Sequence, residues 1–149
     1  SQVEGLVIGE HGSTQVLLFS SIRIDGKPVA ADEQTKQRIK GEVPKIFRKL
    51  EGLKAGRTAG YTCAFGIAAT VHAIKYDTGK LLPCSLILKG EYGYRNLSMT
   101  VPAIVGKGGI REVQEWQIAA DEKAELAVSA RTIASSMKIV EETLGITGD

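Results

Sequence analysis

The sequence is poor in aromatic residues and has no long apolar run, and each shortage excludes a class of protein. Aromatic residues make up 5% of the 149 residues, too few for a base-stacking platform that binds single-stranded nucleic acid. The 19 basic and 17 acidic residues leave a formal net charge of +2. This charge is too small to indicate binding to nucleic acid or to a membrane surface. No apolar run approaches the roughly 18 residues of a membrane span, and no signal-peptide pattern is present.

The two cysteines and two histidines lack the spacing of metal ligands. Cys63 and Cys84 form no C-x-x-C motif, so we expect two buried free thiols in a reducing cytoplasm. His11 and His72 belong to no H-E-x-x-H motif, which argues against a zinc hydrolase. The glycine-rich stretch 105–109 lacks the pattern G-x-x-x-x-G-K-[ST] and predicts a turn between strands.

Length and composition are typical of one globular domain. Hydrophobic residues make up 43% of the chain and charged residues 24%, and 149 residues are enough to enclose a core. The chain begins with Ser1-Gln2 directly before a predicted strand. We therefore expect a domain that is part of a longer protein.

The first third predicts a hairpin followed by an amphipathic helix. Asp25-Gly26 is a strong two-residue hairpin signal, and Pro28 restricts the return strand to a short or edge position. Asp32 predicts a helix N-cap. Apolar residues then recur at helical spacing through Ile39, Val43, Ile46, Leu50 and Leu53. Pro44 should divide this helix into two consecutive pieces.

The next predicted helix, from residue 59 to about residue 76 with Thr58 as its cap, is rich in alanine and glycine. Apolar side chains lie on more than one of its faces, so we expect it to be buried on several sides. One side, around Ala64, Ala68 and Val71, is expected to form a subunit or domain contact. His72 on the same helix is interpreted as a structural or interface histidine.

The second half predicts paired strands and a long helix. Residues 81–89 and 97–101 predict an antiparallel pair that ends at Pro102, and residues 110–118 predict the next strand. Asp121 is expected to cap a helix that extends to Leu144 and ends at Gly145. The predicted fold class is α+β, a twisted, mainly antiparallel sheet packed against long helices over about 32–76 and 121–144.

The stretch Val7-Ile8-Gly9-Glu10-His11-Gly12 places a histidine at the end of a short apolar strand. Glycines on either side allow unusual dihedral angles and a close approach of the backbone. Histidine exchanges a proton near neutral pH, which suits general acid–base catalysis. The other interpretation is a histidine without a catalytic role, whose ring is hydrogen-bonded at the surface or in the core. Glu10 is a poor partner for His11, because adjacent strand residues point to opposite faces.

Gly9-Glu10-His11-Gly12 resembles the active-site histidine motif of the lactate/malate dehydrogenase family. Three further stretches resemble the same family in the same order: Gly60-Tyr61-Thr62-Cys63-Ala64, residues 97–106 and residues 109–113. The resemblance implies that residues 1–149 are the C-terminal, substrate-binding half of an NAD(P)-dependent dehydrogenase that acts on a 2-hydroxy acid such as malate or lactate.

The resemblance also implies roles for individual residues and partners. His11 would take the proton from the alcohol and return it to the ketone, with Gly12 and Thr62 contacting the substrate. NAD or NADP would be bound mainly by an N-terminal Rossmann domain that this chain lacks, together with an orienting aspartate and a carboxylate-binding arginine. We therefore expect the chain alone to be inactive, and the whole enzyme to be a cytoplasmic homo-dimer or tetramer.

Two features leave this interpretation open. Many members of the family continue the histidine motif with an aspartate, where this chain has Ser13, so a negative charge near His11 is missing. The alanine-rich helix also fits a different class of protein, a stand-alone domain that associates with itself or a partner and does no chemistry.

Overall fold

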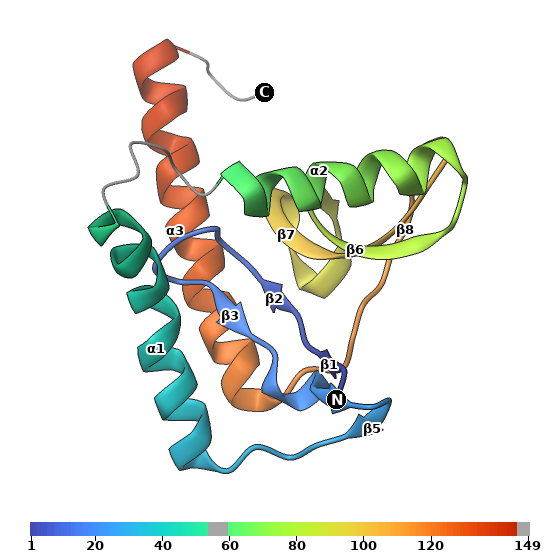
Figure 1. Ribbon diagram of the computed structural model, residues 1–149. Helices are drawn as coiled ribbons and strands as arrows, with labels where there is room; N and C mark the ends of the chain where they lie inside the picture. The colour runs from blue at the N-terminus through green and yellow to red at the C-terminus, as the bar shows by residue number, and fades with distance from the viewer. Residues whose placement is uncertain (54–59, 146–149) are drawn as a thin grey trace.

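The computed structural model describes residues 1–53 and 60–145 (Figure 1). Its largest sheet has three antiparallel strands in the order β6-β7-β8. These strands are β6 (Lys80–Lys89), β7 (Arg95–Gly106) and β8 (Gly109–Val113). The helices are α1 (Glu33–Gly52), α2 (Gly60–Lys75) and α3 (Ala120–Leu144). This arrangement confirms the predicted α+β class.

Short strands near the N-terminus form two smaller antiparallel sheets. One contains β1 (Val3–Glu4), β4 (Arg23–Ile24) and β5 (Lys27–Pro28), and the other pairs β2 (Val7–Ile8) with β3 (Val16–Leu17). The predicted hairpin is confirmed, because β4 pairs with β5 and both turn residues, Asp25 and Gly26, have positive φ. Two 3₁₀ turns, Phe19–Ser21 and Glu91–Gly93, complete the elements.

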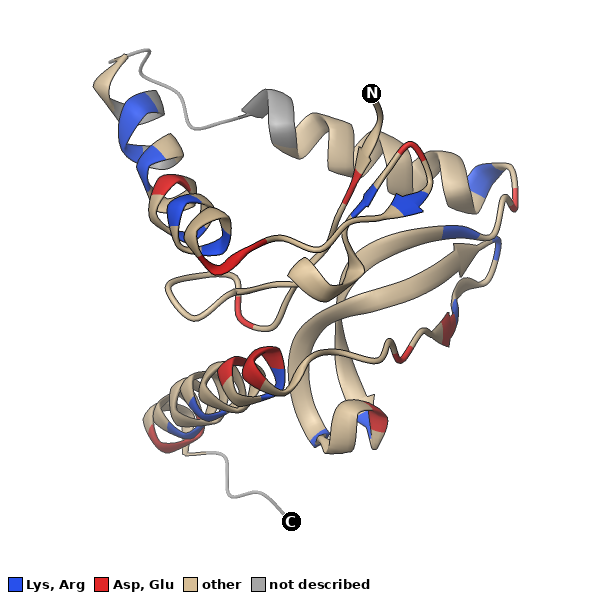
Figure 2. Ribbon diagram, turned by 90° about the horizontal axis from the view of Figure 1, so that it is seen from below, with Lys and Arg blue, Asp and Glu red and all other residues tan. Residues whose placement is uncertain are grey.

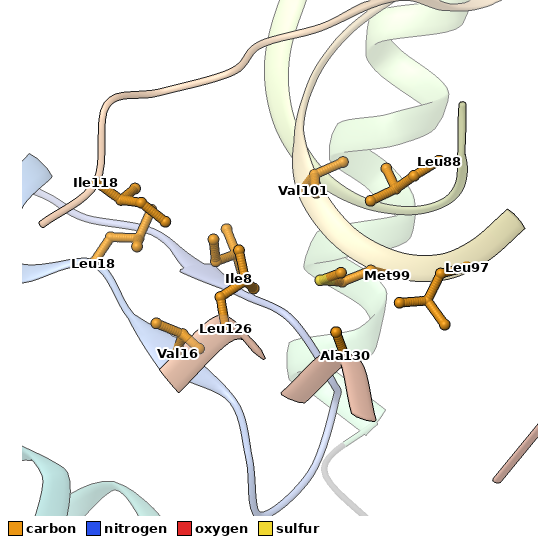
Figure 3. Close-up of a cluster of buried hydrophobic side chains, with 10 residues drawn as sticks. All are labelled: Ile8, Val16, Leu18, Leu88, Leu97, Met99, Val101, Ile118, Leu126 and Ala130. Carbon is orange, nitrogen blue, oxygen red and sulfur yellow. The ribbon is translucent and has the colours of Figure 1, made fainter. Parts of the chain in front are cut away.

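Strand β7 runs through the centre of the larger sheet and supplies much of the core. Leu97, Met99 and Val101 alternate with more exposed neighbours, as the sequence predicts, and all three are buried. Their side chains meet residues of β2, β3 and α3 in one cluster (Figure 3). The cluster contains Ile8, Val16, Leu18, Leu88, Leu97, Met99, Val101, Ile118, Leu126 and Ala130.

Helix α2 lies along the sheet and contacts β7 (Figure 1). Two ion pairs join α1 to α3, Lys36 with Asp121 and Lys40 with Glu125. In each helix the paired residues are four positions apart, so they lie on one face. None of the described helices is long and apolar enough to cross a bilayer.

Helix α1 begins as predicted but is not divided at Pro44. The Asp32 carboxylate accepts a hydrogen bond from the Thr35 N–H at 2.6 Å, which confirms Asp32 as the cap. The helix continues through Pro44 to Gly52, so the expected division into two pieces is wrong. Proline removes one hydrogen bond and crowds the carbonyl four residues earlier. Pro44 lies on the exposed part of the helix, where its ring displaces no core side chain.

Strand β7 continues through Pro102, so the prediction that Pro102 ends the strand is wrong. Pro102 lies directly opposite Pro83 of β6, and its carbonyl accepts a hydrogen bond from the Gln114 N–H. The N and C=O of one strand residue point to the same side. Both therefore point away from β6, and the β6–β7 pairing loses no hydrogen bond. The following strand is shorter than predicted, because β8 ends at Val113.

Helix α3 has Ala119 at its N-cap, two residues before the predicted Asp121. The Glu122 carboxylate accepts a hydrogen bond from the Ala119 N–H and two more from the N–H and hydroxyl of Ser20. Glu122 is buried, at 2% exposure. These bonds satisfy its charge and fix where the helix begins. Gly145 ends the helix as predicted, with φ of 64°.

The prediction that the alanine-rich helix is buried on several sides is wrong for this chain. Ala73 of α2 is fully buried, but Ala64, Ala68 and Val71 are exposed, because α2 covers the sheet with one side only. The prediction of two buried thiols is also wrong, since Cys63 is exposed and Cys84 is half-buried. Thr58, the expected cap, and residue 59 lie outside the described residues.

We expect Glu122→Ala to lower the free energy of unfolding by about 2 kcal/mol, because the Ala119 and Ser20 N–H groups lose a charged acceptor. Glu142→Ala on the same helix is the matched control. Glu142 is exposed and pairs only loosely with Lys138, at 3.7 Å, so its loss should change stability by less than about 0.5 kcal/mol. Urea denaturation of both variants measures the difference. Equal stability of the two would show that the buried carboxylate does not hold the start of α3.

Candidate functional site

Residues 9–14 form the loop that carries His11, which we call the histidine loop. It begins where β2 reaches the edge of β7. The Gly9 N–H donates to the Thr100 carbonyl at 2.9 Å, and the Thr100 N–H donates to the Gly9 carbonyl at 3.0 Å. This pair attaches the start of the loop to the central strand.

Gly9 is needed for both its conformation and its lack of a side chain. Its φ is +91°, a value that residues with a side chain rarely adopt. A Cβ atom at this position would lie 2.5 Å from the Ser129 hydroxyl oxygen of α3. The same hydroxyl accepts a hydrogen bond from the Glu10 N–H at 2.6 Å. The absence of a side chain at Gly9 therefore lets α3 bind the loop backbone directly.

The Glu10 side chain closes the loop on itself. Its carboxylate accepts hydrogen bonds from the Thr14 hydroxyl and from the Thr14 N–H, the latter at 2.9 Å. The pKa of Glu10 is lowered from its usual value, first by the Thr14 hydroxyl and then by the Thr14 N–H. A Cβ atom on Gly12 would lie 2.2 Å from this carboxylate. Gly12 therefore leaves room for the closed turn.

The His11 side chain is exposed. Within residues 1–53 and 60–145, its imidazole makes no hydrogen bond or ion pair. The neighbouring carboxylate of Glu10 is engaged with Thr14 instead. The structure thus holds the backbone on both sides of His11 while its imidazole is open to a substrate or to another protein surface.

The other candidate residues are placed as follows. Gly12 is adjacent to His11 in the loop and is exposed. Thr62 lies in the first turn of α2, and its side chain is outside the described residues. His72 stacks its ring against Tyr76, with centroids 4.7 Å apart and planes inclined by 49°. Ser13 lies beside a cavity of about 310 Å³ between the loop, α1 and α3.

The described part of the chain contains no group of three His, Cys, Asp or Glu side chains that could hold a metal ion. The glycine-rich residues 106–109 form the turn between β7 and β8, as the sequence predicts. They do not lead into a helix N-terminus, which a phosphate-binding loop requires.

Analysis of the sequence missed Ser129 and the Glu10–Thr14 closure. The signal for Ser129 is its position three residues after Leu126 and four before Ile133, which places a hydroxyl on the buried face of the helix. Ser129 is fully buried, and a buried hydroxyl requires a partner. No sequence pattern indicated the hydrogen bonds between Thr14 and Glu10, because these bonds depend on the shape of the loop.

Comparison with known proteins gives one consistent result. The family described as lactate/malate dehydrogenase, alpha/beta C-terminal domain, matches residues 1–144. A malate dehydrogenase of Natronomonas pharaonis is 40% identical over 116 residues, which cover 78% of this chain and 38% of that protein. A malate dehydrogenase structure from Salinibacter ruber has a TM-score of 0.84 at 31% identity, over 94% of this chain and 46% of that one.

A further solved structure has a TM-score of 0.85 to this chain but only 23% sequence identity, so it shows a common fold and nothing more. It is a Cryptosporidium parvum lactate dehydrogenase complexed with lactic acid and nicotinamide adenine dinucleotide, and the match covers 93% of this chain and 46% of that one. The chain spans less than half the length of these relatives.

The lowered pKa of Glu10 predicts how the histidine loop responds to acid. Because the folded-state pKa lies below the usual value, the closure is complete above that value and is lost as pH falls through the folded-state pKa. The Thr14 amide proton shift should therefore titrate with a midpoint below the ordinary value of 4.5. Glu10→Gln should show an altered Thr14 shift at neutral pH.

Glu91→Gln is the matched control for that titration. Glu91 accepts a hydrogen bond from the Lys89 N–H in a different turn, so this variant should leave the Thr14 amide unchanged. A Thr14 midpoint at or above 4.5, or an unchanged Thr14 shift in Glu10→Gln, would contradict the closure.

Proposed function

Because the chain belongs to the lactate/malate dehydrogenase family as its α/β C-terminal domain, we propose that it is the substrate-binding half of an NAD(P)-dependent 2-hydroxy acid dehydrogenase. The observation that carries the proposal is the exposed His11 on a loop whose backbone is bound to β7 and α3. An alternative function as a stand-alone association domain is not favoured by the comparisons.

The proposed role of His11 follows from the chemistry of the alcohol. Oxidation to a ketone removes a proton from the hydroxyl, so a base must lie within hydrogen-bond reach of that oxygen. Neutral imidazole accepts this proton, and imidazolium donates it to the ketone oxygen in the reverse reaction. An exposed imidazole suits both directions.

We assign binding of NAD or NADP mainly to an N-terminal Rossmann domain of the whole enzyme. The described residues do not fit a dinucleotide, because their glycine-rich turn joins two strands instead of a strand and a helix. The nicotinamide supplies the hydride chemistry when it is bound. A lactate dehydrogenase with this fold has been solved with nicotinamide adenine dinucleotide and lactic acid, which supports a nicotinamide dinucleotide as the cofactor.

The substrate is proposed to be malate or lactate. Several malate dehydrogenases share 30% identity or more with this chain, so malate is the first substrate to test. Gly12 and Thr62 are proposed as substrate contacts beside His11. Gly12 follows His11 directly in the exposed part of the loop, which supports its proposed role.

The open face of α2 is proposed to contact a second copy of this chain in a homo-dimer or tetramer. Its exposed residues include Phe65, Ile67 and Val71, at 78%, 65% and 54% exposure. Figure 2 shows no charged residue along the described part of this helix before its last turn. A contiguous apolar face of this kind is typical of a permanent interface between subunits.

We expect His11→Asn in the whole enzyme to lower kcat by about 10² to 10⁴. Asparagine keeps a hydrogen bond but cannot cycle a proton. The KM for the dinucleotide should change little, because that group binds to the other domain.

The same substitution at His72 is the control for His11→Asn. His72 stacks on Tyr76 in α2, outside the histidine loop, so His72→Asn should keep kcat within about threefold of the wild type. Near-normal turnover in His11→Asn would contradict the proposed role of His11.

Ala68→Arg tests the open face of α2. Ala68 is exposed in this chain, so the arginine should leave the melting temperature of the 149-residue chain nearly unchanged. In the whole enzyme it should dissociate the subunits, because a charge would be buried in an apolar contact. Sedimentation velocity gives the mass of each form.

Ala124→Arg, at an exposed position of α3, is the matched control and should keep the native mass. If Ala68→Arg lowers the melting temperature of the whole enzyme without changing its mass, the face is covered by the N-terminal domain instead. No change in mass or melting temperature would show that the face is exposed in the enzyme.

A further inference from the structure

We propose that Ser129 of α3 is a positioning residue for His11, which acts through the backbone N–H of Glu10. The inference rests on the proposed acid–base role of His11. It adds that the place of the imidazole is fixed by a side chain 118 positions away in the sequence, on a different element.

The position of Ser129 is unusual for a serine. It is fully buried, and Leu126 and Ala130 beside it on α3 belong to the apolar core. A hydroxyl in such surroundings costs free energy unless it is bonded. The buried hydroxyl accepts a hydrogen bond from the Glu10 N–H at 2.6 Å, so it holds the peptide unit between Gly9 and Glu10, at the residue before His11.

Three connections from three different sources hold the backbone around His11. Gly9 pairs with Thr100 of β7, the Glu10 N–H binds Ser129 of α3, and the Glu10 carboxylate binds Thr14 within the loop. The connection through Ser129 is the one that joins the loop to a helix of the core. Without it, the peptide unit between Gly9 and Glu10 is held only at its Gly9 carbonyl, by the Thr100 N–H, and its N–H side loses its partner.

Positioning matters here because the imidazole itself is exposed. An exposed side chain is directed mainly by the backbone that carries it, since few neighbours restrict its rotamers. Proton transfer requires the imidazole to lie within hydrogen-bond reach of the substrate oxygen, and a displacement of about 1 Å can lower the rate about 10²-fold. Loss of the Ser129 hydroxyl should therefore reduce turnover more than substrate binding.

The connection can be measured in the 149-residue chain without any assay of activity. Amide hydrogen exchange by NMR of Ser129→Ala should show the Glu10 N–H exchanging at least about tenfold faster than in the wild type. The Gly9 N–H, which is bound to Thr100, should keep its protection. The chain has two histidines, so the ring signal of His11 should change while that of His72 stays constant.

The consequence for catalysis is measured in the whole enzyme. Ser129→Ala should lower kcat about 10- to 100-fold, with the KM for the dinucleotide within about twofold of the wild type. Ser135→Ala, an exposed serine of the same helix, should change neither value.

The outcomes separate the two proposals. Unchanged exchange of the Glu10 N–H in Ser129→Ala overturns the connection whatever His11 does. Faster exchange with unchanged kcat shows that Ser129 has a structural role only, and a fall in kcat that matches the fraction of folded enzyme shows the same. A fully active His11→Asn enzyme rejects the acid–base role of His11, independently of the exchange result.

Discussion

The hydrogen-bonded pair between Gly9 and Thr100 is the contact on which the position of the histidine loop depends. It joins the N-terminal strands to β7, the strand that also pairs with β6 and β8 and supplies the centre of the core. Because Gly9 has no side chain, α3 can approach on the other side and bind the same loop. A residue near the N-terminus is thus held by the middle and the end of the chain.

Local patterns were sufficient to predict most elements of this fold. The Asp25-Gly26 turn, the Asp32 cap and the alternation around Met99 each depend on neighbouring residues, and each was confirmed. The errors occurred where distant partners decide the outcome. Pro102 remains within β7 because Gln114 uses its carbonyl, and Glu122 instead of Asp121 defines the start of α3 because Ser20 binds it.

In the candidate site, too, features set by neighbouring residues were predicted and features set by distant partners were not. Glycines beside a strand-terminal histidine indicated that His11 would be displayed on a loop, and the side chain is exposed. The burial of α2 could not be predicted, because the same apolar pattern describes a helix inside a domain and a helix at an interface between chains. The contact of Ser129 with the loop was not predicted, because it joins residues far apart in the sequence.

The facing prolines of β6 and β7 have a consequence for solubility. Pro83 lies opposite Pro102, whose N and C=O point away from β6, so the backbone of Pro83 points to the outer side of β6. Within residues 1–53 and 60–145, no strand pairs with that outer side of the ten-residue strand, and an unpaired edge is a template on which strands from other molecules can aggregate. Proline offers no N–H there, and Lys80 and Lys89 place a positive charge at each end. Pro83 therefore removes a hydrogen-bond donor from the middle of this edge. The two lysines repel the same edge of a second copy at both ends.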